Sequence, residues 1–108
     1  MKKAIWLSYD LGVQGDYEGL YQWLDKRGAI ECGDSLAFFK LEVDDRPIPD
    51  PKEEIKRELQ EAIKVDSRTR VYMIWRQGNS VKGNFIFGQR KAPPWSGYSP
   101  KQSTEDAA

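Results

Sequence analysis

The chain has 108 residues, and its 17 Lys and Arg residues are balanced by 17 Asp and Glu residues. A chain of this size is long enough for one domain with a single core. Zero net charge provides no overall positive field, so any nucleic-acid binding would need a local patch or a dimer groove. The absence of histidine excludes Ser-His and Cys-His triads and histidine metal sites. An enzyme with this sequence would work with carboxylates, hydroxyls or a metal.

The cysteine content and the apolar runs indicate a cytoplasmic protein without membrane contact. The single cysteine, Cys32, cannot form an internal disulfide. The N-terminal run contains Asp10 and does not resemble the core of a signal peptide, and no apolar run approaches the roughly 20 residues of a membrane helix. Cys32 is predicted to be a small packed residue, because no fixed cation or helix start is evident beside it.

Residues 3–10 predict a first strand that ends in an acid, followed by a glycine-bounded loop over residues 11–15. Side chains in a strand alternate between two faces, here Ile5, Leu7 and Tyr9 on one and Trp6, Ser8 and Asp10 on the other. Asp16 then predicts the N-cap of an amphipathic helix that ends near Gly28.

The remainder of the chain predicts a hairpin, a second helix and two more strands. Residues 29–32 and 35–43 are short apolar runs around a Gly-Asp turn. Asp50, Pro51 and Glu53 supply the cap, first-turn proline and acid that begin a helix over 51–65. Strands are expected over 70–76 and 83–88, with a turn over 77–80 between them.

This order predicts an α+β fold: a ferredoxin-like βαββαβ sandwich with an additional C-terminal strand and both helices on one face of an antiparallel sheet. The domain is expected over residues 1–91, with an extended arm and a disordered tail over 92–108. The face of such a sheet that the helices do not cover should be polar. The predicted strands nevertheless carry large apolar residues on both faces, and Trp6 is an example on the uncovered face. We therefore expect a homodimer with the two sheets facing each other.

Three runs carry a resemblance to a known family: Leu-Ser-Tyr-Asp-Leu at 7–11, Ser-Leu-Ala-Phe at 35–38 and Val-Tyr-Met-Ile-Trp at 71–75. With the helix that ends at Gly28, they resemble the small CRISPR-associated Cas-two adaptation proteins. They are equally similar to the chromosomal relatives of those proteins, the SinR-family proteins and the virulence-associated protein D toxins. The resemblance covers most of residues 3–87. It implies a homodimer in which the last strand can join the sheet of the partner.

The resemblance also implies site residues. In members reported to be nucleases the strand-end acid is the proposed Mg²⁺ ligand, and that position is Asp10 here. Ser35 matches the serine beside the cleft, so Asp10 and Ser35 are the candidate catalytic residues and Mg²⁺ is the possible cofactor. The chain departs from the adaptation proteins at residues 15–19, which are acidic and neutral where those proteins often carry basic residues.

The residues themselves leave alternatives open at each site. Asp10 either binds a metal across a two-fold axis or accepts backbone N–H groups of the loop that follows it. Arg90, Lys91 and Trp95 form a basic, aromatic arm that suits a protein partner or an RNA or DNA strand. The alternative for this arm is that it folds back to cover the edge of the sheet.

These predictions lead to two hypotheses about the function. One is a non-catalytic dimeric binding module in a defence, mobile-element or toxin–antitoxin setting. The other is a Mg²⁺-dependent endonuclease that cleaves RNA or DNA with paired Asp10 carboxylates. Zero net charge and the missing basic positions favour the binding module.

Overall fold

The computed structural model describes residues 2–42 and 50–100. In chain order the elements are β1 (Lys2–Asp10), α1 (Tyr17–Lys26), β2 (Ile30–Glu31), β3 (Leu36–Glu42), α2 (Pro51–Ala62), β4 (Arg70–Gln77) and β5 (Ser80–Phe87). The predicted strand end at Val43, the connection over 44–49 and the tail over 101–108 lie outside the described residues.

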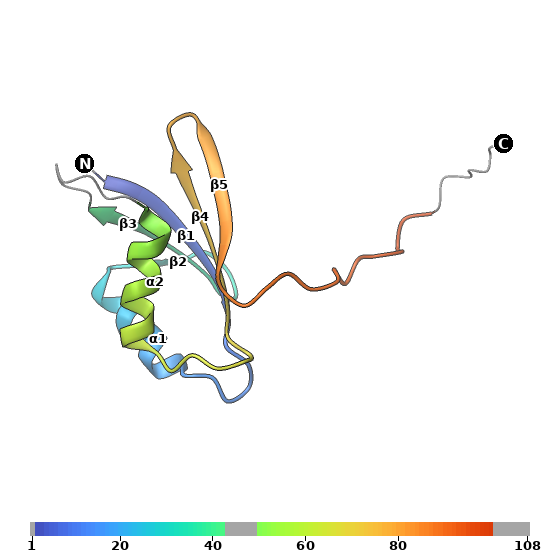
Figure 1. Ribbon diagram of the computed structural model, residues 1–108, viewed down its shortest axis with the longest axis horizontal. Helices are drawn as coiled ribbons and strands as arrows, with labels where there is room; N and C mark the ends of the chain where they lie inside the picture. The colour runs from blue at the N-terminus through green and yellow to red at the C-terminus, as the bar shows by residue number, and fades with distance from the viewer. Residues whose placement is uncertain (1, 43–49, 101–108) are drawn as a thin grey trace.

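The strands form one sheet in the order β2-β3-β1-β4-β5, and every neighbouring pair is antiparallel. Both helices lie on one side of this sheet (Figure 1). The predicted α+β class is therefore confirmed, with a five-stranded antiparallel sheet and two helices among the described residues.

The core lies between the helices and one face of the sheet. Ile5 and Leu7 of β1 are fully buried, while Trp6 between them is only half-buried, as the strand period of two requires. The same alternation runs through β3 and β4, so one set of apolar side chains from each strand faces the helices. The buried members of the sheet are Ile5, Leu7, Ala37, Phe39, Leu41, Val71, Met73, Trp75, Ile86 and Phe87.

Asp16 fixes the start of α1 and the end of α2 together. Its Oδ1 accepts the Gly19 N–H at 3.0 Å, which is the predicted N-cap interaction, and its Oδ2 accepts the Lys64 N–H at 3.0 Å. Helix α2 ends at Ala62, three residues before the predicted end at Val65. The chain becomes extended at Ile63, which lets that side chain enter the core and brings Lys64 to the Asp16 carboxylate.

Strand β5 begins at Ser80 and so starts earlier than the predicted Gly83. Its register slips once: Val71 pairs with Phe87 and Tyr72 with Phe85, so Ile86 is an extra residue on β5. The slip explains why Ile86 and Phe87 are both buried although they are consecutive. Phe85 is left opposite Tyr72 on the face of the sheet away from the helices.

Two further observations concern the surface. Cys32 is exposed, so the prediction of a packed cysteine is wrong. The residue directly follows the two-residue strand β2, which lies at the edge of the sheet. In the part of the chain that the structure describes, neither helix is long and apolar enough to cross a membrane.

Candidate functional site

The face of the sheet that α1 and α2 do not cover is called the open face below, and it is rich in aromatic side chains. The rings of Trp6 and Phe38 lie 5.0 Å apart across β1 and β3, and those of Tyr72 and Phe85 lie 4.8 Å apart across β4 and β5. Ile74 lies opposite Trp6 on β4. All five side chains are half-buried, so apolar residues do occupy both faces, as the sequence predicts.

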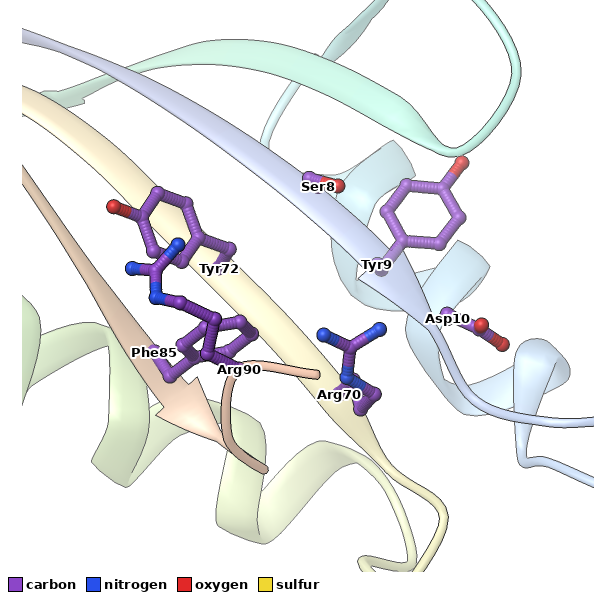
Figure 2. A pocket seen from close by; sticks show the side chains of 7 residues that line it. All are labelled: Ser8, Tyr9, Asp10, Arg70, Tyr72, Phe85 and Arg90. Atoms are coloured by element: carbon purple, nitrogen blue, oxygen red, sulfur yellow. The ribbon is translucent and has the colours of Figure 1, made fainter. Parts of the chain in front are cut away.

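A pocket of about 320 Å³ lies on the open face at the end where β1 finishes (Figure 2). Alternate residues of β1 and β4 point to the open face, and the register slip places Phe85 of β5 on the same face. These side chains form much of the wall of the pocket. Its lining consists of Ser8, Tyr9, Asp10, Arg70, Tyr72, Phe85 and Arg90. We call it the arginine pocket.

Two guanidinium groups lie on the aromatic rings of this pocket. Arg90 lies 5.8 Å from the centre of the Tyr72 ring and 5.5 Å from that of Phe85, and Arg70 lies 5.3 Å from the Phe85 ring. Arg70 Nε also donates to the Gln89 carbonyl at 3.3 Å. Within residues 2–42 and 50–100, neither guanidinium forms an ion pair with a carboxylate. Among the described residues the lining of the pocket therefore has two guanidinium groups and one carboxylate, a local excess of positive charge in a protein of zero net charge.

Asp10 holds the loop that follows β1. Its Oδ1 accepts the Gly12 N–H at 3.0 Å, and the Gly15 N–H donates to the Gly12 carbonyl at 3.2 Å. Gly12 has a φ of 81°, a left-handed conformation that glycine adopts without strain. In Figure 2 the Asp10 carboxylate points away from Arg70 and Arg90, toward this loop. The loop interaction that competes with metal binding is thus present.

The residues of one copy do not fit a Mg²⁺ ion. This cation prefers several oxygen ligands, usually including one or two carboxylates, whereas the arginine pocket combines one carboxylate with two guanidinium groups. The described part of the chain contains no group of three His, Cys, Asp or Glu side chains that could hold a metal. No second carboxylate of the described residues lines this pocket, and the predicted pairing of Asp10 carboxylates brings the second one from another copy.

Ser35 lies in the turn before β3 and not in the wall of the arginine pocket. It has a φ of 63°, which is uncommon for a residue with a side chain. Its carbonyl accepts the Tyr9 N–H at 3.0 Å, so its backbone adjoins the end of β1. Asp10 and Ser35 are therefore near in the fold, but they do not share the pocket.

Of the three predicted arm residues, only Arg90 reaches the pocket. Lys91 is exposed, and the Trp95 side chain is 72 % exposed. Beyond Arg90 the arm runs away from the sheet (Figure 1). Gly88 has a φ of 82° and packs against the Thr69 carbonyl, a sharp change of direction that brings Arg90 back over the rings.

The sequence analysis missed Arg70, Tyr72 and Phe85 as site residues. A signal existed for two of them: Arg70 and Tyr72 lie two residues apart in a predicted strand, so they share a face. The sequence does not show that this face is the one that carries Asp10. That requires the antiparallel register, in which Asp10 pairs with Arg70. Phe85 could not be assigned, because the slip at Ile86 breaks the alternation.

Comparison of the chain with protein-family models, with curated proteins and with solved structures finds no match. The resemblance to the Cas-two-like proteins therefore stays a prediction, and the site is interpreted from its own geometry.

Proposed function

We propose that this protein is a small cytoplasmic homodimer of the Cas-two-like type that acts as a non-catalytic binding module. The setting is a defence, mobile-element or toxin–antitoxin system, CRISPR-associated or chromosomal. The strand order β2-β3-β1-β4 supports the ferredoxin-like arrangement, with β5 as the additional strand. The observation that carries the proposal is the pair of guanidinium groups, which have no carboxylate partner within residues 2–42 and 50–100, beside an Asp10 carboxylate that accepts a hydrogen bond from the loop.

The open face supports the homodimer. Trp6, Phe38 and Ile74 are large apolar side chains that no helix covers. A second copy that brings the same face against this one would remove their surface from water, which is the main driving force of association. With a two-fold axis parallel to β1, the two arginine pockets would lie at the same end of the assembly.

The arginine pocket supports a ligand with phosphate groups and bases, such as single-stranded RNA or DNA. Guanidinium groups bind phosphate oxygens through paired N–H donors. Rings beside them provide surface on which bases stack. The positive charge is local, which agrees with the requirement that zero net charge imposes on any nucleic-acid binding here.

The test is the binding of a fluorescently labelled 12-nucleotide single strand, followed by anisotropy at several salt concentrations. Arg90→Gln is expected to weaken binding about tenfold and to reduce the salt slope by about 0.7, the value for one phosphate contact of a single strand. Arg57→Gln is the matched control, because Arg57 pairs with Glu54 on α2, on the other side of the sheet. Equal effects of the two variants would contradict the proposed site.

The alternative is a Mg²⁺-dependent endonuclease with paired Asp10 carboxylates, and it is supported by the position of Asp10 in the pocket wall. Gel analysis of the same strand with Mg²⁺ or with EDTA separates the two functions. The binding module predicts an intact strand in both. Mg²⁺-dependent cleavage that Asp10→Asn removes, without a change in melting temperature, would establish the nuclease instead.

The homodimer has its own test. Light scattering at micromolar concentration is expected to give twice the monomer mass of 12.5 kDa. Phe38→Glu should return the mass to that of the monomer, because it places a charge in the proposed contact. A monomer at every concentration would refute the dimer.

A further inference from the structure

A second pocket, called the edge pocket here, lies between α1 and β2, the strand at the opposite edge of the sheet from β5. Its volume is about 460 Å³. Its wall includes Tyr9, Tyr21, Leu24 and Ile30 together with the acids Asp25 and Glu31. Tyr21 is 53 % exposed and Ile30 is 59 % exposed, so much of this apolar wall is in contact with water. Tyr9 is the only described residue that belongs to the lining of both the edge pocket and the arginine pocket.

The edge pocket is negatively charged. In the described part of the chain neither Asp25 nor Glu31 forms an ion pair, and Glu31 only accepts the Gly33 N–H at 2.8 Å. Burial raises the pKa of Tyr9, and the neighbouring Tyr21, Tyr17, Glu31 and Asp34 raise it further. The pocket therefore suits an occupant that combines a cation with an apolar ring.

The arm carries this combination. Lys91 is exposed and lies four residues before Trp95, which is 72 % exposed, and Tyr98 is 83 % exposed. Two hydrogen bonds give residues 93–98 a local shape: the Ser96 N–H donates to the Pro93 carbonyl at 3.1 Å, and the Tyr98 N–H donates to the Trp95 carbonyl at 3.0 Å. The two prolines restrict the backbone in advance, which lowers the entropy lost on docking.

We propose that Lys91 and Trp95 of one copy dock in the edge pocket of a second copy, so that the two arms are exchanged across the dimer. The indole ring of Trp95 packs against Tyr21 and Ile30, and the Lys91 ammonium group lies between Asp25 and Glu31. This inference rests on the proposed homodimer and names a contact that the open faces do not provide.

The sheet topology supports an exchange between copies. The arm leaves β5 at Phe87, which pairs with Val71, and Val71 pairs with Tyr9 of the edge pocket. Arm and edge pocket therefore lie at the same end of the strands, on opposite edges of the sheet. Because β1 is the middle strand, a two-fold axis parallel to it between facing open faces places β5 of one copy over β2 of the other, without a shift along the strands.

The length of the arm agrees with this placement. In an extended proline-rich chain, the four steps from Lys91 to Trp95 span about 12 Å. This is enough for the ring to enter a pocket while the ammonium group stays with the acids at its rim. In its own copy the arm runs away from the sheet (Figure 1). None of its described residues belongs to the lining of the edge pocket.

The test is a charge exchange read as the dimer dissociation constant by sedimentation of the full chain. Lys91→Glu and Trp95→Ala are each expected to weaken the dimer about tenfold or more. Combining Lys91→Glu with Asp25→Lys and Glu31→Lys should restore much of the loss, because the new charges again attract each other. Lys64→Glu is the matched control, since this exposed residue lies in neither the arm nor the edge pocket.

The outcomes separate the inference from the proposed function. A dimer that Lys91→Glu and Trp95→Ala leave unchanged would overturn the arm exchange and leave the binding module intact. A monomer at every concentration would overturn both the dimer and the exchange, while the labelled strand would still test the arginine pocket.

A third outcome concerns docking within one copy. The fluorescence of Trp95, taken as the difference between the native chain and Trp95→Phe, should shift to the blue only as the protein concentration rises. A blue shift that does not depend on concentration would mean that the arm folds onto its own copy, and it would overturn the exchange.

Discussion

The two faces of the sheet carry similar aromatic side chains, but these side chains differ in burial and in their contacts. Phe39 of β3 is 2 % exposed and its ring lies edge-on to Trp23 of α1 at 5.4 Å. Phe38, the preceding residue, lies on the open face, 5.0 Å from the Trp6 ring and only half-buried. The strand period of two thus places two neighbouring phenylalanines on different faces, Phe39 in the core and Phe38 on the open face.

The arginines show the same division. On the helix-covered side Arg27 forms an ion pair with Glu58, and Trp23 Nε1 donates to the same Glu58 oxygen at 3.1 Å, so the charge is satisfied between α1 and α2. On the open face Arg90 lies over aromatic rings without a carboxylate partner among the described residues. The comparison indicates that side chains on the helix-covered face maintain the fold, while the open face has guanidinium groups without carboxylate partners among the described residues.

The largest expected effect is the difference between the two phenylalanines. Phe39→Ala is expected to lower the free energy of unfolding by about 3 to 5 kcal/mol, because it leaves a cavity in the core. Phe38→Ala should cost about 1 kcal/mol, mainly the lost contact with Trp6. Urea unfolding of both variants measures this difference.

Protein concentration sharpens the same comparison. The cost of Phe38→Ala should grow with concentration, because the open face is the proposed dimer contact. The cost of Phe39→Ala should change little. Equal costs for the two variants would mean that the faces do not differ in the way described.

A smaller effect is expected from the arginines. Arg27→Gln should lower the free energy of unfolding by about 2 kcal/mol, since it leaves the Glu58 carboxylate half-buried without its cation. Arg90→Gln should leave the melting temperature unchanged and reduce only the affinity for the labelled strand. Thermal unfolding and anisotropy of both variants provide the check. If Arg90→Gln lowered the melting temperature as much as Arg27→Gln, the difference between the two faces of the sheet would be contradicted.

The smallest effect concerns Asp16, which joins the two helices beside the sheet. The N–H groups of Gly19 and Lys64 hold the pKa of this carboxyl below its usual value. A lowered pKa in the folded state means that its stabilisation is present above the pKa of the unfolded chain and is lost as the pH falls through the folded-state pKa.

Stability should therefore decline as the pH falls below about 4, the usual range for an unfolded aspartate. Asp16→Asn is expected to flatten this part of the profile. Melting temperatures measured from neutral to acid pH provide the check, and an unchanged acid slope in the variant would show that Asp16 is not responsible.

The elements of the fold could be predicted wherever local chemistry determines them. Asp16 and Asp50 cap their helices as expected, since a cap depends on residues close in the chain. The end of α2 could not be predicted, because it depends on Asp16, 48 residues away from Lys64. The slip at Ile86 was also hidden, since β5 shows it only against β4.

The candidate site was predictable only in part for the same reason. Asp10 is marked by its place at the end of a strand, and Arg90 by the basic arm. Arg70, Tyr72 and Phe85 reach them through strand pairing, which a single sequence does not specify. The Asp10 carboxylate could be assigned to the loop only when the position of Gly12 was known.

Gly83 on β5 cannot be replaced by a larger residue without moving a neighbouring side chain, although it is exposed. The residue is exposed, yet a Cβ added to it would lie 2.5 Å from the Tyr72 hydroxyl oxygen and 3.0 Å from two ring carbons. A larger residue would force the Tyr72 ring to move, and this ring is part of the lining of the arginine pocket. Under the proposed function, a library of Gly83 variants sorted for folding alone would accept substitutions that a library sorted for binding of the labelled strand rejects.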